Sequence, residues 1–137
     1  MERIKYNSDV MKFMSLFESM TGAKLKDCIA NGNVIFIVQE SEMGKAIGKN
    51  GSNIKRMENL LKKSVRLIEF NDDVCKFVAN LVYPSTADDI KEEDGVVSIY
   101  VRDAKAKGII IGRDRHRISM VNSIAKRYFA VKEIKVA

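Results

Sequence analysis

The spacing of hydrophobic positions predicts six elements in the first half of the chain. Helical segments carry apolar residues three or four positions apart, and extended segments are short apolar, β-branched runs. Asn31-Gly32 is a two-residue hairpin signal between the first two strands. The predicted order is a helix at about 9–20, strands at 24–30 and 34–39, helices at 43–47 and 52–63, and a strand at 65–70.

The second half predicts the same order of elements. Its first helix ends before Pro84, the only proline in the chain. An acidic segment with a weak strand signal leads to a turn at Asp94-Gly95. The predicted elements are a helix at about 73–83, a strand through the acidic segment, a strand at 96–102, helices at 104–110 and 115–129, and a strand at 131–136.

A constant offset of 64 residues relates the two halves without a gap. Chance similarity rarely keeps one register across glycines and the apolar positions around them. We therefore expect two copies of one small α-β-β-α-α-β module. The matching pairs are Asn7/Asn71, Asp9/Asp73, Val10/Val74, Lys12/Lys76, Phe13/Phe77, Ile35/Ile99, Phe36/Tyr100, Ile37/Val101, Gly44/Gly108, Ile47/Ile111, Gly48/Gly112 and Ile54/Ile118.

A short loop separates the second and third helices of each copy. In the first copy it reads Gly48-Lys49-Asn50-Gly51. Its glycines permit positive φ and a close approach of the backbone to a ligand. The amides at the start of the next helix favour an anion, and the lysine adds positive charge. The pattern predicts a phosphate-binding loop, although a lone Gly-x-x-Gly is a weak signal by itself.

Positive charge is concentrated around both loops. The net charge is +6, and 46% hydrophobic with 31% charged residues is typical of a folded protein. Residues 43–66 hold seven basic side chains against one acid, and residues 105–127 also hold seven against one. One such stretch is equally compatible with a solvated helix face. Two equivalent stretches, each centred on a loop, favour a polyanionic partner.

Several classes of protein are disfavoured. The longest apolar run, 34–38, is too short to span a bilayer, and residues 1–5 lack the apolar core of a signal peptide. Cys28 and Cys75 are isolated, and the chain has one histidine, so no zinc site is expected. We expect a cytoplasmic protein with no membrane partner, metal or cofactor.

Catalysis is also not expected. Gly44 and Gly48 are one residue too close for a nucleotide-binding P-loop, and Asn50 stands where a serine or threonine would follow the lysine. His116 lies near the second loop without a visible catalytic partner. The sequence predicts neither an enzyme nor a small-molecule substrate, and an enzymatic role would require a larger complex.

The element order, with Ile47-Gly48-Lys49-Asn50-Gly51 between two short helices, resembles the KH domain in its type II variant. Two abutting copies are similar to the RNA-binding part of the NusA family of transcription factors, and above all to its short archaeal members. Further support comes from the stretches 14–23, 43–51, 101–103 and 108–112. The resemblance implies an α+β, two-layer fold with KH domains at 1–71 and 72–137, each with a three-stranded sheet backed by helices.

The resemblance also implies a function and site residues. KH loops clamp the backbone of single-stranded RNA, and groove residues read unstacked bases. The second loop, Gly112-Arg113-Asp114-Arg115, lacks the second glycine and contains an acid, so its clamp departs from the family pattern. Single-stranded RNA and RNA polymerase are the implied partners, in transcription termination or elongation. The alternative to a transcription factor is a KH-type RNA-binding protein that acts in ribosome assembly or is part of the ribosome's structure. The implied RNA-binding residues are Ile47, Gly48, Lys49, Asn50, Gly51, Ile54, Lys55 and Arg56, with Gly112, Arg113, Arg115 and Arg117 in the second copy.

Overall fold

The computed structural model describes residues 8–137. They form two compact units that adjoin in the sequence at Asn71 and Asp72. The predicted repeat pair Asn7/Asn71 is the one pair with a member outside the described residues. Each unit has its own three-stranded sheet, so each is described by itself.

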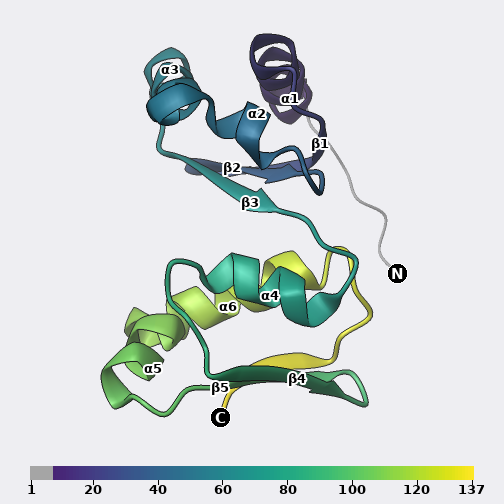
Figure 1. The fold of residues 1–137 in the computed structure, drawn as a ribbon, viewed down its shortest axis with the longest axis vertical. Helices are drawn as coiled ribbons and strands as arrows, with labels where there is room; N and C mark the ends of the chain where they lie inside the picture. Colours follow the sequence, from purple (N-terminus) through teal and green to yellow (C-terminus); the bar gives the residue numbers. More distant parts are fainter. Residues whose placement is uncertain (1–7) are drawn as a thin grey trace. The chain divides into compact units, whose positions relative to one another are not determined.

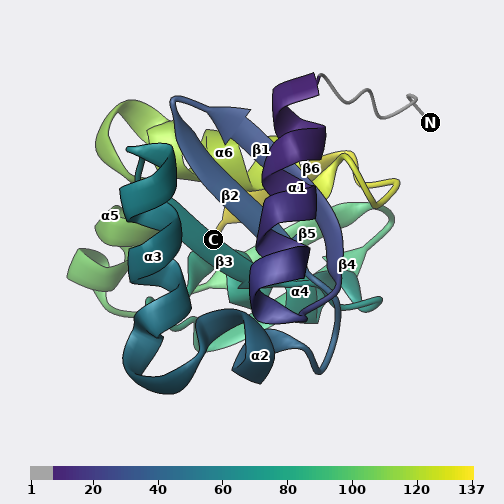
Figure 2. The same cartoon turned by 90° about the horizontal axis from the view of Figure 1, so that it is seen from above.

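In the first unit, helices cover one face of the sheet (Figures 1 and 2). The strand order is β1-β2-β3, with β1 antiparallel and β3 parallel to the central strand. Gly22 ends the first helix with a φ of 76°. The elements are α1 (Ser8–Thr21), β1 (Leu25–Asn31), β2 (Asn33–Val38), α2 (Met43–Ile47), the 3₁₀ turn η1 (Lys49–Gly51), α3 (Ser52–Leu61) and β3 (Val65–Glu69).

The second unit repeats this topology with strand order β4-β5-β6. The Asp73 carboxylate caps its first helix by accepting a hydrogen bond from the Cys75 amide at 2.8 Å. The predicted α+β class, with helices backing a three-stranded sheet, is confirmed. The elements are α4 (Val74–Val82), β4 (Asp89–Glu93), β5 (Val96–Tyr100), α5 (Ala104–Ile111), η2 (Arg113–Arg115), α6 (His116–Ala125) and β6 (Glu133–Val136).

Each unit has an aromatic contact in its core. In the first, the rings of Phe17 and Phe36 stack with centroids 4.4 Å apart. In the second, Phe77 packs edge-on against Tyr128 with centroids 5.7 Å apart. All three phenylalanines are fully buried. Because each ring removes a large apolar area from water, the first contact fixes α1 on β2, and the second fixes α4 against the turn that follows α6.

The sequence prediction of the first hairpin was wrong by one residue. Asn31 pairs with Asn33, so Gly32, with a φ of 80°, is the single residue between the two paired strands. The second hairpin was predicted correctly, since Glu93 pairs with Val96 across a two-residue turn. The last helix is shorter than predicted, because tight turns follow Ala125 and the amide of Phe129 bonds back to the carbonyl of that residue at 3.0 Å.

The central strands correct the ungapped repeat. That repeat pairs Phe36 with Tyr100, but Phe36 is fully buried and Tyr100 is 42% exposed. The buried counterpart of Phe36 in β5 is Ile99. The strands therefore align at an offset of 63, and one extra residue precedes the second loop. The corrected buried pairs are Val34/Val97, Phe36/Ile99 and Val38/Val101, in place of the predicted Ile35/Ile99, Phe36/Tyr100 and Ile37/Val101.

Over residues 8–137, no helix has both the length and the apolar character required to cross a bilayer.

Candidate nucleic-acid interface

The two loops share one backbone conformation. The φ and ψ angles are 72° and 176° at Gly48, and 78° and 170° at Gly112. Two positions later, they are 56° and 31° at Asn50, and 54° and 31° at Asp114. The fourth loop residue is left-handed in both, at 70° and 19° in the first unit and 61° and 18° in the second. Loss of the second glycine has therefore not changed the turn.

Arg115 occupies that fourth position in the second loop. A side chain in the left-handed region costs about 1–2 kcal/mol relative to an ordinary conformation. Gly51, at the same position of the first loop, adopts the region without this penalty. The second loop thus reaches the same shape with conformational strain at Arg115.

The first loop presents the groups that an anion requires. Within residues 8–137, the amides of Lys49 and Asn50 have no hydrogen-bond acceptor. Both side chains are exposed, and α3 begins directly after the loop. Successive amides in a turn of this kind form a concavity that binds anions. The two amides without an acceptor and the exposed lysine are groups whose chemistry suits an anion.

The other predicted residues of the first unit lie around this loop. Ile47 and Ile54 are half-buried beside it, whereas Lys55 and Arg56 are exposed on the following helix. No acidic group within residues 8–137 forms an ion pair with Lys49, Lys55 or Arg56. Their positive charge is consequently available to a polyanion.

Lys45 differs from these free basic residues because it is paired. Its Nζ lies 3.3 Å from Glu42 Oε2, and the other oxygen of this carboxylate accepts the amide of Lys24 at 3.0 Å. The hydrogen bond from the Lys24 amide, followed by the bond and charge of Lys45, holds the pKa of Glu42 below its usual value. Glu42 stands at the start of α2 and joins that helix to the strand side of the unit.

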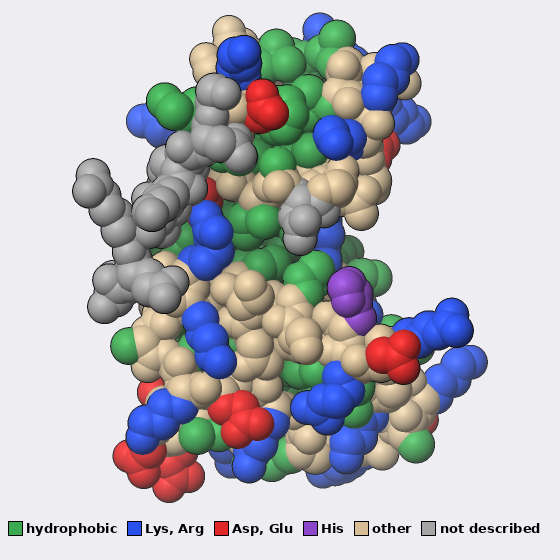
Figure 3. Space-filling model, turned by 180° about the vertical axis from the view of Figure 1, so that it is seen from behind, with side chains coloured by type: hydrophobic (Ala, Val, Ile, Leu, Met, Phe, Trp, Pro, Cys, Tyr) green, Lys and Arg blue, Asp and Glu red, His purple; other side chains and the backbone are tan. Residues whose placement is uncertain are grey.

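The second loop is exposed but of mixed charge. Arg113, Asp114, Arg115 and His116 are all exposed. Figure 3 shows blue and red charged side chains next to the purple histidine. The structure gathers Gly112, Arg113, Asp114, His116 and Arg117 around one shallow depression. Asp114 places a negative charge inside this loop, where the first loop has the neutral Asn50.

Arg117 is turned inward rather than toward a ligand. Its guanidinium donates to the carbonyl of Val82 at 2.8 Å, the carbonyl of Ile109 at 3.2 Å and the hydroxyl of Ser85 at 3.3 Å. The residue is only partly exposed. These bonds engage the guanidinium with the body of the unit, in contrast to the exposed Arg113.

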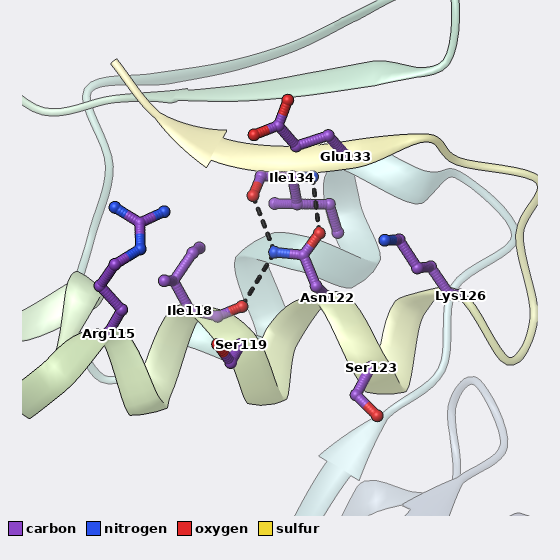
Figure 4. Close-up of a pocket in the computed structure, with 8 residues that line it drawn as sticks. All are labelled: Arg115, Ile118, Ser119, Asn122, Ser123, Lys126, Glu133 and Ile134. Atoms are coloured by element: carbon purple, nitrogen blue, oxygen red, sulfur yellow. Dashed lines mark hydrogen bonds between the residues drawn. The ribbon is translucent and has the colours of Figure 1, made fainter.

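Sequence reasoning missed a groove between α6 and β6 (Figure 4). Its volume is about 410 Å³, and Arg115 and Lys126 lie near its two ends. Asn122 lies between them and donates through Nδ2 to the carbonyls of Ile118 and Ile134 at 2.9 and 2.8 Å. Its Oδ1 accepts a hydrogen bond from the amide of Ile134 at 2.8 Å.

The sequence contains one signal of this groove. Polar residues are spaced i, i+4 and i, i+3 along α6, which places them on one face of the helix. The lining residues are Arg115, Ile118, Ser119, Asn122, Ser123, Lys126, Glu133 and Ile134.

The first unit has a carboxylate at the corresponding position. Glu58 Oε2 accepts the amide of Val65, the first residue of β3, at 3.0 Å. Unlike the amide of Asn122, a carboxylate has no donor for a strand carbonyl. The edges of the two outer strands are therefore covered to different degrees.

Within the described residues, no group of three or more His, Cys, Asp or Glu side chains is arranged to hold a metal ion.

Comparison with known proteins identifies the family. A sequence model described as "KH domain" matches residues 14–83, about half of the chain and including the whole first loop. A probable transcription termination protein NusA from Methanococcus vannielii is 36% identical over 138 residues, covering 98% of this chain and 80% of the relative. The protein of the same description from Halococcus morrhuae is 33% identical, and the alignment covers 98% of this chain and 99% of that relative. The chain belongs to the KH-domain family, among its NusA-like members.

A solved structure supports the same assignment. The structure described as "Crystal structure of APE1850" has a TM-score of 0.77 and 27% sequence identity, and covers 96% of this chain and 100% of that chain. KH domains are RNA-binding modules in which a Gly-x-x-Gly loop clamps the nucleic-acid backbone. The loop at residues 48–51, with exposed side chains between two glycines, matches that description.

Proposed function

We propose that the protein binds single-stranded RNA through two tandem KH modules, residues 1–71 and 72–137, and that the first loop holds the phosphates. The observation that carries this proposal is the turn at 48–51, whose amides at Lys49 and Asn50 have no acceptor within the described residues. The unpaired charges of Lys49, Lys55 and Arg56 add electrostatic attraction. Ile47 and Ile54 form the apolar floor beside the loop.

The second module contributes mainly a basic surface. Its loop keeps the backbone shape of the first, and Arg113 and Arg115 are exposed beside Gly112. Asp114 repels a phosphate at the same place, so we assign this loop a weaker grip. Arg117, with its guanidinium bonded to three groups of its own unit, is not assigned a phosphate contact.

The relatives suggest where this RNA binding acts. Two relatives, 36% and 33% identical over alignments that cover 98% of this chain, are described as probable transcription termination proteins. We therefore propose a cytoplasmic, non-enzymatic factor that acts on nascent RNA and associates with RNA polymerase. Affinity purification tests this partner: RNA polymerase is expected in the eluate. Stable co-purification with ribosomal particles instead would favour a role in ribosome assembly or structure.

RNA binding itself is tested by fluorescence anisotropy with labelled single-stranded RNA, duplex RNA and single-stranded DNA. The single-stranded RNA is expected to bind most tightly. If about four phosphates are neutralised, log K should fall with log salt at a slope of about −3, since each phosphate on a single strand contributes about −0.7. A flat salt response, or equal affinity for duplex RNA, would contradict the proposal.

A further inference from the structure

Each loop is closed by a side chain at the same position. The residue five places after the first glycine bonds back to the carbonyl three places before it. In the first unit, Asn53 Nδ2 donates to the carbonyl of Lys45 at 2.9 Å. In the second, Arg117 Nη1 donates to the carbonyl of Ile109 at 3.2 Å. Two chemically different side chains thus make one equivalent bond, from the helix after the loop to the helix before it.

The residues that carry these two side chains also lie close to the first glycine of each loop. A Cβ added to Gly48 would lie 2.7 Å from Asn53 Nδ2, and one added to Gly112 would lie 2.6 Å from Arg117 Cβ. Real Cβ atoms do not approach other atoms so closely. The connecting amide of Asn53 thus excludes a Cβ at Gly48, whereas the backbone and Cβ of Arg117 exclude one at Gly112; both glycines also have positive φ.

Arg117 makes further connections that Asn53 is too short to make. It reaches the carbonyl of Val82 at the end of α4 and the hydroxyl of Ser85 just beyond it. A planar guanidinium with five donors can bond several acceptors in one fixed geometry. Its charge also lies at a helix C-terminus, where a cation is favourable. This anchor is present in the unit whose loop carries the strained residue Arg115.

We propose that Asn53 and Arg117 are positioning residues, each of which holds the loop of its unit in the phosphate-binding conformation without contacting RNA. Asn53 keeps the amides of Lys49 and Asn50 directed at the ligand, and Arg117 offsets the strain of a loop with one glycine. A preformed loop binds more tightly because less conformational freedom is lost on binding. The affinity consequence rests on the proposed RNA binding, but the effect on the free loop does not.

The decisive variant is Asn53→Leu, because a leucine side chain is close in size to asparagine and has no hydrogen-bond donor. In the free protein, hydrogen exchange and ¹⁵N relaxation are expected to show greater motion of the amides of residues 49–51. The Kd for single-stranded RNA is expected to rise about tenfold through lost preorganisation, with an unchanged salt slope because no charge is removed. Asn59→Leu is the matched control, since Asn59 is exposed on the same helix. It should leave both readouts at wild-type values.

Three results would overturn the proposal for Asn53. A raised Kd with an unchanged free loop would make Asn53 a direct RNA contact. A lower melting temperature with unchanged Kd and unchanged loop motion would make it a purely structural residue. No change in any readout would remove its role altogether. Failure of the wild-type protein to bind RNA would instead refute the proposed function, while loop motion in the free variant would still test the positioning role.

Arg117 is tested by two replacements that both remove its charge. Arg117→Asn retains an amide donor of the kind used in the first unit, whereas Arg117→Met retains only the stem. The amides of residues 113–115 are expected to become more mobile in the methionine variant and to be largely restored in the asparagine variant. The salt slope is expected to stay at the wild-type value in both. A slope shallower by about 0.7 with a rigid loop would show that Arg117 contacts a phosphate.

Discussion

The first and second loops have the same backbone but obtain it differently. The first uses two glycines and the short amide of Asn53. The second uses one glycine, a left-handed arginine and the long anchor of Arg117. The comparison teaches that loss of a motif glycine does not predict loss of the turn, because a tertiary contact can offset the strain. What separates the loops is the acidic side chain of Asp114 in the second, where the first has the neutral Asn50.

A second contrast lies at the outer strands. Asn122 bonds both the amide and the carbonyl of Ile134, so the edge of β6 at this point is closed by the protein itself. Glu58 bonds only the amide of Val65 in β3. The first unit thus has the more open strand edge as well as the loop without an acidic residue. Both differences favour the first unit as the main RNA-binding site.

The largest expected effect comes from placing acids in the first loop. Replacing Lys49 and Asn50 together by aspartate should weaken RNA binding about 1,000-fold, or about 4 kcal/mol. The new carboxylates would repel phosphate at short range, and the glycines that set the turn remain. Fluorescence titration measures the loss, with circular dichroism as the control for folding. For comparison, Arg113→Ala should weaken binding only a few-fold; a larger loss in that variant would make the second loop the clamp.

Next in size is the effect of alanine at the first glycine of each loop. Gly112→Ala should destabilise the protein by about 3 kcal/mol, because its Cβ would lie 2.9 Å from the backbone nitrogen of Arg117. Gly48→Ala should cost about 2 kcal/mol, since its nearest neighbour is the movable amide of Asn53. Urea unfolding of both variants gives the comparison. Equal costs would show that positive φ alone sets the cost, and that the close backbone of Arg117 adds nothing at Gly112.

A smaller difference is expected at the strand edges. Asn122→Leu removes three hydrogen bonds and should cost about 2 kcal/mol, whereas Glu58→Leu removes one and should cost about 1 kcal/mol. Thermal unfolding of the two variants measures both values. A larger cost for Glu58→Leu would contradict the view that the second strand edge is the more firmly covered.

The smallest effect should be a gain. Arg115→Gly relieves a left-handed side chain, with φ of 61°, but increases the freedom of the unfolded chain. The net stabilisation should be about 0.5 kcal/mol, measurable as a small shift of the urea midpoint. Arg102→Gly, at an exposed residue with no positive φ, is the control and should not stabilise. A destabilised Arg115→Gly variant would show that Arg115 makes a contact worth more than its strain.

Much of the fold was predictable from the sequence, because hydrophobic spacing, glycines and the single proline mark the elements. The register between the two copies was not. The run Val34-Ile35-Phe36-Ile37-Val38 is apolar throughout, so it hides which alternate residues face the helices. An ungapped comparison therefore passes over the extra residue before the second loop, where α5 begins earlier with Asp103 as its cap.

The candidate site was predictable in part for a similar reason. The first loop is local, so its glycines and lysine indicate their role in sequence. Arg117 could not be distinguished from the exposed arginines beside it, because its partners Val82 and Ser85 lie more than thirty residues away. Asn122 likewise depends on Ile134, which only the fold brings to it.

The central claim, that the loop at residues 48–51 is the main RNA clamp, is tested most directly by NMR titration of the ¹⁵N-labelled protein with single-stranded RNA. The amides of Lys49, Asn50 and Gly51 are expected to show the largest shift changes, followed by those at the start of α3. The amides of residues 112–115 should change less at the same RNA concentration. Larger changes at the second loop, or none at either, would contradict the account.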